Sequence, residues 1–270
     1  MHIFETANAP RVIDINSAQN QRYKGWLGLL DGRGIKKQGE ALVSGPKIIR
    51  EILAMFSERA LGLIVRDLAE LDALAPAPLP GEESDFAIFR MAPELFSELD
   101  IYGINAPLLI ISAPPPPVWD ARLTPGLTLF LPFQNPINLG TTIRSAAALG
   151  APVVLLKEAA SPYLPKSLRA SGPALFQTPL WRGPSLAELA ALSRDLPLYA
   201  LSPEGQNIFQ FDFPPDCGLV AGMEGPGLTG DWPKERLLSI PMCAGVESLN
   251  AAMAVSMALA CRLARAKNIV

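Results

Sequence analysis

The sequence predicts two α/β domains joined by a proline-rich segment, and three observations lead to that prediction. The chain has 270 residues, which suggests roughly two domains at about 150 residues each. Hydrophobic residues make up 49% of it, enough to bury a substantial core. The four successive prolines at 114–117 cannot continue a helix or a central strand. We therefore expect a first domain at 1–113, a stiff linker at 114–121 and a second domain at 122–270.

In the first domain, apolar segments of strand length alternate with segments typical of helices. This alternation favours an α/β layer with a largely parallel sheet. The basic segment 32–40, GRGIKKQGE, is expected to be a loop, and so is 76–85. The remaining segments are expected as strands at 41–45, 61–66, 86–91 and 108–112, and as helices at 18–30, 46–56 and 93–101.

The second domain alternates more plainly. Asn138 is expected to cap its first helix and Gly150 to end it. The last helix is apolar on most of its surface, which indicates burial on more than one side. Strands are expected at 127–133, 153–156, 197–201, 218–222 and 237–240, and helices at 138–149, 185–194 and 247–266.

Several classes of chemistry are disfavoured by composition. The only histidine is His2, so a histidine base, a Ser-His-Asp triad or a histidine-ligated metal is not expected. Cys217, Cys243 and Cys261 are odd in number and lack metal-ligand spacing, so we expect no disulfide framework, no zinc site and a reducing cytoplasm. No apolar stretch is long enough to span a membrane, and the first residues show no signal peptide pattern.

The charge of the chain is unevenly distributed. Its net charge of −3 argues mildly against a nucleic-acid partner when taken alone. Residues 11–50, however, hold eight Lys or Arg against three Asp or Glu, whereas residues 51–113 hold three against eleven. The first of these segments is therefore basic, and RNA remains a possible partner.

Three segments of the second domain combine a strand end with glycine or polar residues. They are NPINLGTTIRSA at 135–146, GMEGPG at 222–227 and IPMCAGVESLN at 240–250. Taken singly, each also fits a capped helix or an ordinary turn. At the carboxyl end of a parallel sheet, such segments instead surround ligands.

In this order, the three segments resemble the motifs of the SpoU (TrmH) family, which are S-adenosylmethionine-dependent RNA ribose 2'-O-methyltransferases. The segment PKSLRASG at 165–172 also resembles the family, so the likeness covers nearly all of 122–270. The resemblance implies an α/β fold with a knotted (trefoil) parallel-sheet methyltransferase domain. The first domain is similar to the small α/β, ribosomal-protein-like domain with which many members bind substrate RNA.

The resemblance also implies site residues and a cofactor, S-adenosylmethionine. The implied catalytic residues are Arg144, Asn138, Glu224, Ser248 and Asn250. The implied cofactor-binding residues are Leu201, Gly222, Ile240, Met242 and Leu249. No metal is implied.

The role of Arg144 has two alternatives at this point. The family pattern suggests a base at the ribose hydroxyl, but a guanidinium rarely loses a proton in proteins. We favour a role in binding a phosphate and stabilising the developing oxyanion. Asn138 would then orient Arg144 or the ribose, Glu224 would position substrate or accept a proton indirectly, and Ser248 and Asn250 would complete the hydrogen-bond network.

The expected partners are RNA and a second copy of the chain. A separate first domain favours ribosomal RNA over transfer RNA, and the apolar last helix favours a homodimer through the second domain. Three alternatives stay open: a tRNA ribose 2'-O-methyltransferase, a non-catalytic RNA-binding homologue, and a nucleotide-dependent dehydrogenase. The last lacks a GxGxxG segment after its first strand.

Overall fold

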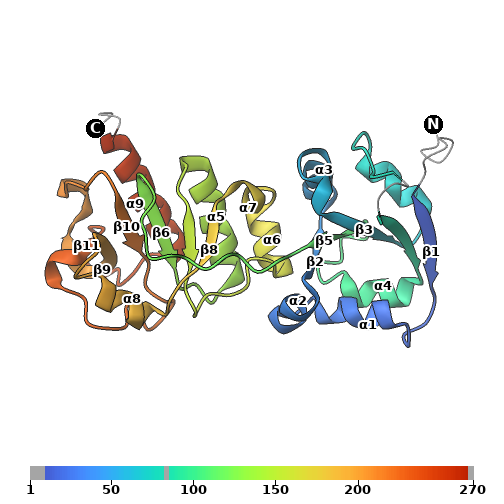
Figure 1. Cartoon of the computed structure of the whole chain (residues 1–270), viewed down its shortest axis with the longest axis horizontal. Helices are drawn as coiled ribbons and strands as arrows, with labels where there is room; N and C mark the ends of the chain where they lie inside the picture. The colour runs from blue at the N-terminus through green and yellow to red at the C-terminus, as the bar shows by residue number, and fades with distance from the viewer. Residues whose placement is uncertain (1–9, 82–84, 267–270) are drawn as a thin grey trace. The chain divides into compact units, whose positions relative to one another are not determined.

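The computed structural model describes residues 10–81 and 85–266, which form two compact units (Figure 1). Unit 1 ends at Pro115 and also takes in Tyr163–Arg169, whereas unit 2 begins at Pro116 and resumes at Ala170. The grouping of 163–169 with unit 1 was not expected from the sequence. Residues 1–9, which include His2, lie outside the described residues. None of the described helices is both long and apolar enough to cross a bilayer.

Unit 1 is an α/β layer, but its sheet is mixed rather than largely parallel. The strand order is β1-β4-β3-β5-β2, in which β4 pairs parallel with both of its neighbours and β5 pairs antiparallel with both of its own. Helices α1, α2 and α4 lie along one face of the sheet, and α3 lies across the other (Figure 1). The elements are β1 (Arg11–Ile15), α1 (Gln21–Gly28), α2 (Gly32–Gln38), β2 (Glu40–Ser44), α3 (Pro46–Met55), β3 (Ala60–Val65), β4 (Ala87–Met91), α4 (Pro93–Leu99) and β5 (Leu108–Ser112).

The expected basic loop at 32–40 is wrong, because most of it is helix α2. Asp31 caps the helix by accepting from Arg33 N at 2.7 Å, and Gly39 ends it in the left-handed region at φ 68°. Gly34 has a packing role in this helix, because a Cβ there would lie 1.9 Å from the Gly28 carbonyl oxygen. Glycine therefore permits α1 and α2 to touch.

Unit 2 contains a six-stranded sheet in the order β11-β9-β10-β6-β7-β8, and every pairing is parallel. Phe130, Val154 and Val220 of this sheet pack with α8 in one apolar cluster. On α5 and α9, Ser256 Oγ donates to Ser145 Oγ at 2.9 Å. The elements from residue 127 onward are β6 (Leu127–Leu131), α5 (Pro136–Leu149), β7 (Val153–Leu155), α6 (Pro165–Ser171), α7 (Ala174–Gln177), β8 (Leu180–Arg182), α8 (Leu186–Leu192), β9 (Leu198–Asn207), β10 (Cys217–Val220), β11 (Leu237–Ser239) and α9 (Ala251–Ala266), of which α6 groups mostly with unit 1.

Two expected helix starts in unit 2 differ from the structure. Asn135, not Asn138, caps α5, since its side chain accepts from Ile137 N at 2.9 Å and from Asn138 N at 3.4 Å. The last helix begins at Ala251, so residues 247–250 precede it instead of opening it. Elements α6, α7 and β8 were not predicted.

The proline-rich segment is only partly a spacer. Arg182 of β8 donates from Nε to Pro116 O and from its backbone N to Pro117 O, each at 2.8 Å. Its carbonyl accepts from Trp119 N at 2.9 Å, and Val118 forms a parallel bridge with Arg182. Residues 116–119 therefore extend the sheet beyond β8. Proline lacks an N–H, so this added edge offers few donors to another strand.

Two arginines near the end of α9 bind carbonyl groups of the segment between β9 and β10. Arg262 Nη2 donates to Pro214 O and Pro215 O at 3.2 and 2.9 Å. Arg265 donates to Phe209 O and Phe211 O. These bonds hold the last helix to the segment that connects β9 and β10.

Candidate functional site

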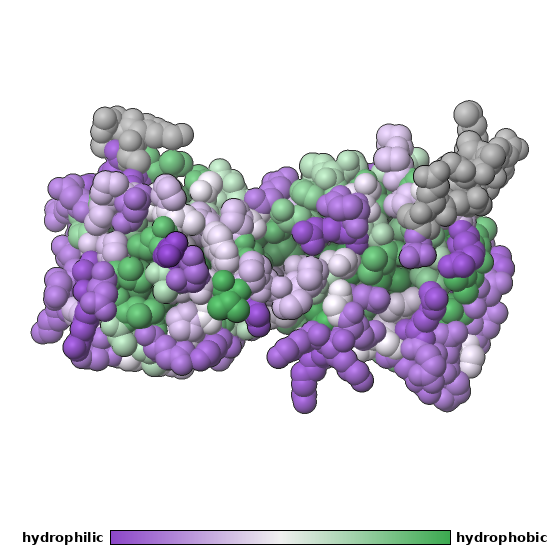
Figure 2. Space-filling model, in the orientation of Figure 1, coloured by the Kyte–Doolittle hydropathy of each residue, from purple (hydrophilic) through white to green (hydrophobic). Residues whose placement is uncertain are grey.

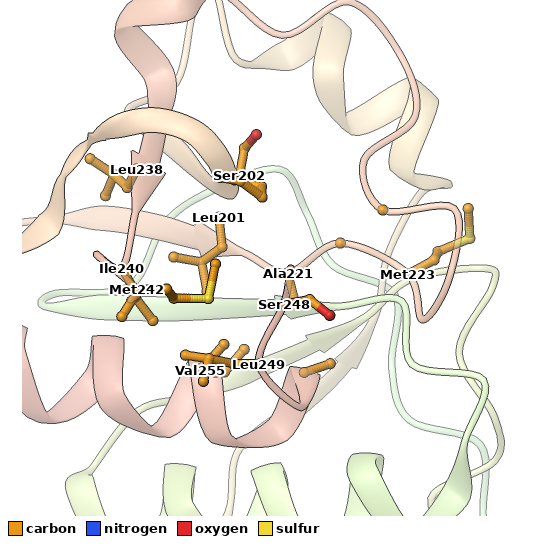
Figure 3. Close-up of a pocket in the computed structure, with 15 residues that line it drawn as sticks. Leu201, Ser202, Ala221, Met223, Leu238, Ile240, Met242, Ser248, Leu249 and Val255 are labelled. Carbon is orange, nitrogen blue, oxygen red and sulfur yellow. The ribbon is translucent and has the colours of Figure 1, made fainter. Parts of the chain in front are cut away.

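A pocket of about 180 Å³, open to solvent, lies at the carboxyl edge of the unit 2 sheet. Figure 3 shows the Leu201 side chain pointing towards Met242 and Ile240, with Leu249 and Val255 on the side of α9. The five residues implied to bind the cofactor all line this one pocket, although they come from three separate stretches of chain. They are Leu201, Gly222, Ile240, Met242 and Leu249.

One wall of the pocket is a tight glycine-rich hairpin. Met223 N donates to Gly227 O at 2.8 Å, and Gly227 N donates to Met223 O at 3.1 Å. A Cβ on Gly222 would lie 3.0 Å from the Gly227 carbonyl carbon, so the two glycines pack backbone to backbone. The positive φ of Gly225 and Gly227, 88° and 71°, completes the turn. A ligand in the pocket can therefore approach bare backbone.

The turn presents Glu224 to the start of α5. The Glu224 carboxylate accepts from Gln134 N at 3.0 Å, from Asn135 N at 3.3 Å and from Asn138 Nδ2 at 3.2 Å. Asn138 Oδ1 in turn accepts from Asn250 Nδ2 at 3.0 Å. One chain of hydrogen bonds thus joins all three sequence motifs.

Asn250 and Ser248 differ in their surroundings. Asn250 Oδ1 accepts from Met253 N at 3.2 Å, which satisfies one of the free N–H groups at the start of α9. Ser248 is exposed and lines the pocket. The structure therefore places Asn250 in the hydrogen-bond chain, and Ser248 beside the space that a ligand would fill.

Arg144 is not among the residues that line the pocket. It occupies α5 and is exposed. Its guanidinium forms no hydrogen bond or ion pair with the described residues. An exposed, unpaired guanidinium can donate to a phosphate or an oxyanion from outside the protein.

Sequence reasoning missed some of the residues that form this site. Asn135 was quoted in a motif but not assigned a role, although an asparagine directly before a proline is a sequence signal for a helix cap. Ser202 and Pro203 also line the pocket, and no motif marks them. Among the described residues, no cluster of His, Cys, Asp or Glu is arranged to hold a metal ion.

The profile of the SpoU rRNA Methylase family matches residues 128–260. The 23S rRNA (uridine(2479)-2'-O)-methyltransferase of Streptomyces viridochromogenes is 31% identical over 257 residues, covering 89% of this chain and 88% of that protein. The crystal structure of the SpoU methyltransferase AviRb from Streptomyces viridochromogenes, in complex with the cofactor AdoMet, aligns with a TM-score of 0.74 at 28% identity. That alignment covers 92% of this chain and 99% of the other.

A longer relative matches with higher identity. The protein named Ribosomal RNA small subunit methyltransferase G 2 from Syntrophobacter fumaroxidans is 42% identical over 248 residues, which cover 91% of this chain. The match covers 48% of that protein, so this chain spans about half of its length.

Proposed function

The chain belongs to the SpoU rRNA methylase family and is an S-adenosylmethionine-dependent RNA ribose 2'-O-methyltransferase, and from this premise we propose that its substrate is large-subunit ribosomal RNA. The Streptomyces viridochromogenes relative, which aligns over nearly its whole length, carries 23S rRNA in its name. The single structural observation that supports an active enzyme is the hydrogen-bond chain from Glu224 through Asn138 to Asn250.

The pocket at the carboxyl edge is the proposed cofactor site. Its lining is mainly apolar, which suits the adenine and the methionine chain, and Gly222 has no side chain to keep a ligand away from the backbone. When bound, S-adenosylmethionine supplies a methyl group on a positively charged sulfur, already a strong donor. The residues of this chain then have to hold the ribose hydroxyl in line and ease the loss of its proton.

Arg144 is the proposed contact for the RNA at the reacting ribose. Its unpaired guanidinium binds a phosphate and stabilises the negative charge that develops on the 2'-oxygen. Asn138 and Glu224 are positioning residues here, because their polar groups are bonded to each other and to the start of α5. Ser248, exposed at the pocket, is placed to complete the polar contacts to substrate or cofactor.

Residues 1–113, which make up most of unit 1, are the proposed RNA-binding domain. Figure 2 shows hydrophilic side chains projecting over α1 and α2. These two helices carry exposed basic residues that suit phosphate contacts whose affinity falls with added salt. The residues are Arg22, Lys24, Arg33, Lys36 and Lys37.

The proposed assembly is a homodimer through unit 2. Met253 and Met257 lie one turn apart on α9 with 55% and 39% of their surface exposed. Val246 and Leu249, just before the helix, and Ile137 at the start of α5 are exposed as well. Large apolar side chains gathered at helix faces are typical of a protein interface. A second copy of the chain would cover them.

The proposal includes a knotted C-terminal segment and a cytoplasmic location. Strand β11 lies at one edge of the sheet. Helix α9, which follows it, packs against α5, and α5 connects the interior strands β6 and β7. The segment 240–250 joins β11 to α9 along the carboxyl edge, and this path supports the knotted arrangement that the family resemblance implies. A cytoplasmic location accords with the ribosomal substrate.

Mapping 2'-O-methyl groups in total RNA, with and without this protein, tests the proposed substrate. We expect one 23S rRNA position to lose its methyl group in a strain without the protein and to regain it on addition of the purified chain. A site in 16S rRNA would instead favour the small-subunit substrate named for the longer relative, and a site in tRNA would favour a tRNA enzyme. Binding to RNA without any methyl transfer would indicate the non-catalytic alternative.

A further inference from the structure

The pairing of strand β9 with β11 is interrupted where β9 borders the pocket. It pairs with β11 at Ala200–Leu237 and again at Gln206–Leu238, so residues 201–205 lie between two consecutive residues of β11. We refer to residues 201–205 as the β9 excursion. It supplies Leu201, Ser202 and Pro203 to the pocket wall. The shape of the wall therefore depends on how the excursion rejoins the sheet.

Gly205 is the residue at which the excursion rejoins β11. A Cβ there would lie 2.4 Å from Leu238 N and 2.5 Å from the carbonyl carbon of Leu237. Both are backbone atoms of a paired strand, so neither can turn aside as a flexible side chain would. The requirement for glycine is one of space at this strand contact.

Within the excursion, the side chains have separate roles. Leu201 points towards Met242 in the pocket, whereas the Ser202 hydroxyl points away from it (Figure 3). Ser202 Oγ accepts from Glu204 N at 3.3 Å, which closes a turn inside the excursion. Gln206 Nε2 donates to Glu235 O at 3.2 Å and holds the exit of the excursion. Hydrogen bonds thus fix the excursion at its turn and at its exit. Leu201 is the side chain that the excursion places in the pocket wall.

We propose that Gly205 is a positioning residue for S-adenosylmethionine, because its lack of a side chain lets the β9 excursion close on β11 and place Leu201 in the pocket wall. The proposal rests on the proposed function, which assigns this pocket to the cofactor. Gly205 belongs to none of the three sequence motifs.

The test compares Gly205→Ala with wild-type protein in the full chain. Calorimetry measures the Kd for S-adenosylmethionine, and methyl transfer to total ribosomal RNA gives KM and kcat. We expect the Kd and the cofactor KM to rise about tenfold or more, since overpacking forces the backbone to shift. At saturating cofactor, kcat should stay within about threefold of wild type.

Gly218→Ala is the matched control. Gly218 lies in β10, and its added Cβ would crowd Leu198 Cδ2 at 2.5 Å and Phe130 Cε2 at 2.6 Å. It does not line the pocket. This variant should lose stability while its cofactor Kd stays unchanged. An unchanged Kd in Gly205→Ala, or an equal rise in both variants, would overturn the proposal.

If Gly205→Ala fails to fold, Gln206→Ala takes its place. This substitution removes only the exposed hydrogen bond at the excursion's exit, and we expect the Kd to rise a few-fold; an unchanged Kd overturns the proposal.

Failure of the proposed function has a different signature, because wild-type protein itself would then bind no S-adenosylmethionine.

Discussion

Asn138 and Glu224 are bonded directly, with Asn138 Nδ2 donating to Glu224 Oε1 at 3.2 Å. The same carboxylate also accepts the backbone N–H groups of Gln134 and Asn135. A negative charge is favourable at the N-terminus of a helix, and here it ties the glycine hairpin to the start of α5. A carboxylate engaged by three donors is better suited to fixing this segment than to taking a proton from the ribose.

Glu224→Gln should therefore lower stability and cofactor affinity together with activity. The amide would place an NH₂ group against a backbone N–H that now faces a carboxylate oxygen. Loss of a hydrogen bond to a charged group costs about 1.5–3 kcal/mol. We expect a lower urea midpoint, a raised Kd for S-adenosylmethionine, and a pH–rate profile of unchanged shape.

A proton-accepting Glu224 would behave differently. In that case Glu224→Gln would lose about 10²-fold or more in single-turnover rate while stability and cofactor Kd stayed at wild-type values. Gln134→Ala is the matched control, because the bond to Glu224 comes from its backbone N, which the substitution keeps.

Arg144→Ala should reduce single-turnover methyl transfer by about 10²–10³-fold, the loss typical of removing one donor to a developing oxyanion. Cofactor Kd should not change, because Arg144 does not line the pocket. Arg144→Lys should recover only part of the rate, since an ammonium lacks the planar fork of a guanidinium. Methyl transfer that survives in Arg144→Ala, with RNA binding alone weakened, would refute a catalytic role.

The sequence predicted five of the six strands of the unit 2 sheet, all but β8, because buried parallel strands read as short apolar runs between glycine and proline residues. It placed the α5 cap at Asn138 because two asparagines stand three residues apart, and only the structure shows that Asn135 accepts the first N–H groups. Gly34 lowers the local helix propensity of α2, yet in the structure it packs against Gly28 of α1. That contact is tertiary, so local propensity could not reveal it.

The β9 excursion and the docked proline segment escaped prediction for a related reason. Pro203 and Gly205 lie within β9, and both are signals that normally end a strand. The partner of the proline segment is Arg182, distant in sequence from residues 116–119. The sequence marks such residues as unusual but does not identify what they pack against.

Trp119→Ala should destabilise unit 2 strongly. Its indole is 8% exposed, packs edge-on against Phe130 with ring centroids 4.9 Å apart, and donates from Nε1 to Arg122 O at 2.7 Å. Truncation of a buried tryptophan costs about 3–5 kcal/mol, and urea unfolding measures it. The neighbouring Val118→Ala, at a side chain that is 69% exposed, should stay within about 0.5 kcal/mol of wild type. Equal, small losses of unfolding free energy in both variants would mean that residues 116–119 are a spacer that does not pack on unit 2.

Because of Glu188, the free energy of unfolding should decrease as the pH falls through the acid range. Hydrogen bonds from Lys157 Nζ, at 2.7 Å, and from Ser185 N, also at 2.7 Å, lower the pKa of this carboxyl from 4.5 to about 2. Because the folded-state pKa is depressed, the stabilisation is present above about pH 4.5 and is lost as the pH falls towards 2. Glu188→Gln keeps a side chain that suits the capping box with Ser185 but removes the charge.

The urea midpoint of Glu188→Gln should therefore lie below that of wild type at pH 7, and the difference should shrink as the pH falls from 4.5 towards 2. Glu94→Gln, at an exposed glutamate of α4, is the control and should show a smaller difference. A gap between Glu188→Gln and wild type that is the same at pH 7 and pH 3 would show that the ion pair does not contribute.

Met253→Asp combined with Met257→Asp should separate the proposed homodimer into monomers. Both side chains lie on the same face of α9, and a carboxylate buried in an apolar interface without a partner is strongly unfavourable. Sedimentation should give wild-type protein about twice the chain mass of 28.9 kDa and the double variant a single chain mass. Met55→Asp, at a methionine of α3 that is 50% exposed, controls for surface charge and should remain dimeric. A wild-type protein that sediments as a monomer at every concentration would refute the dimer, and the exposed α9 face would then require another partner.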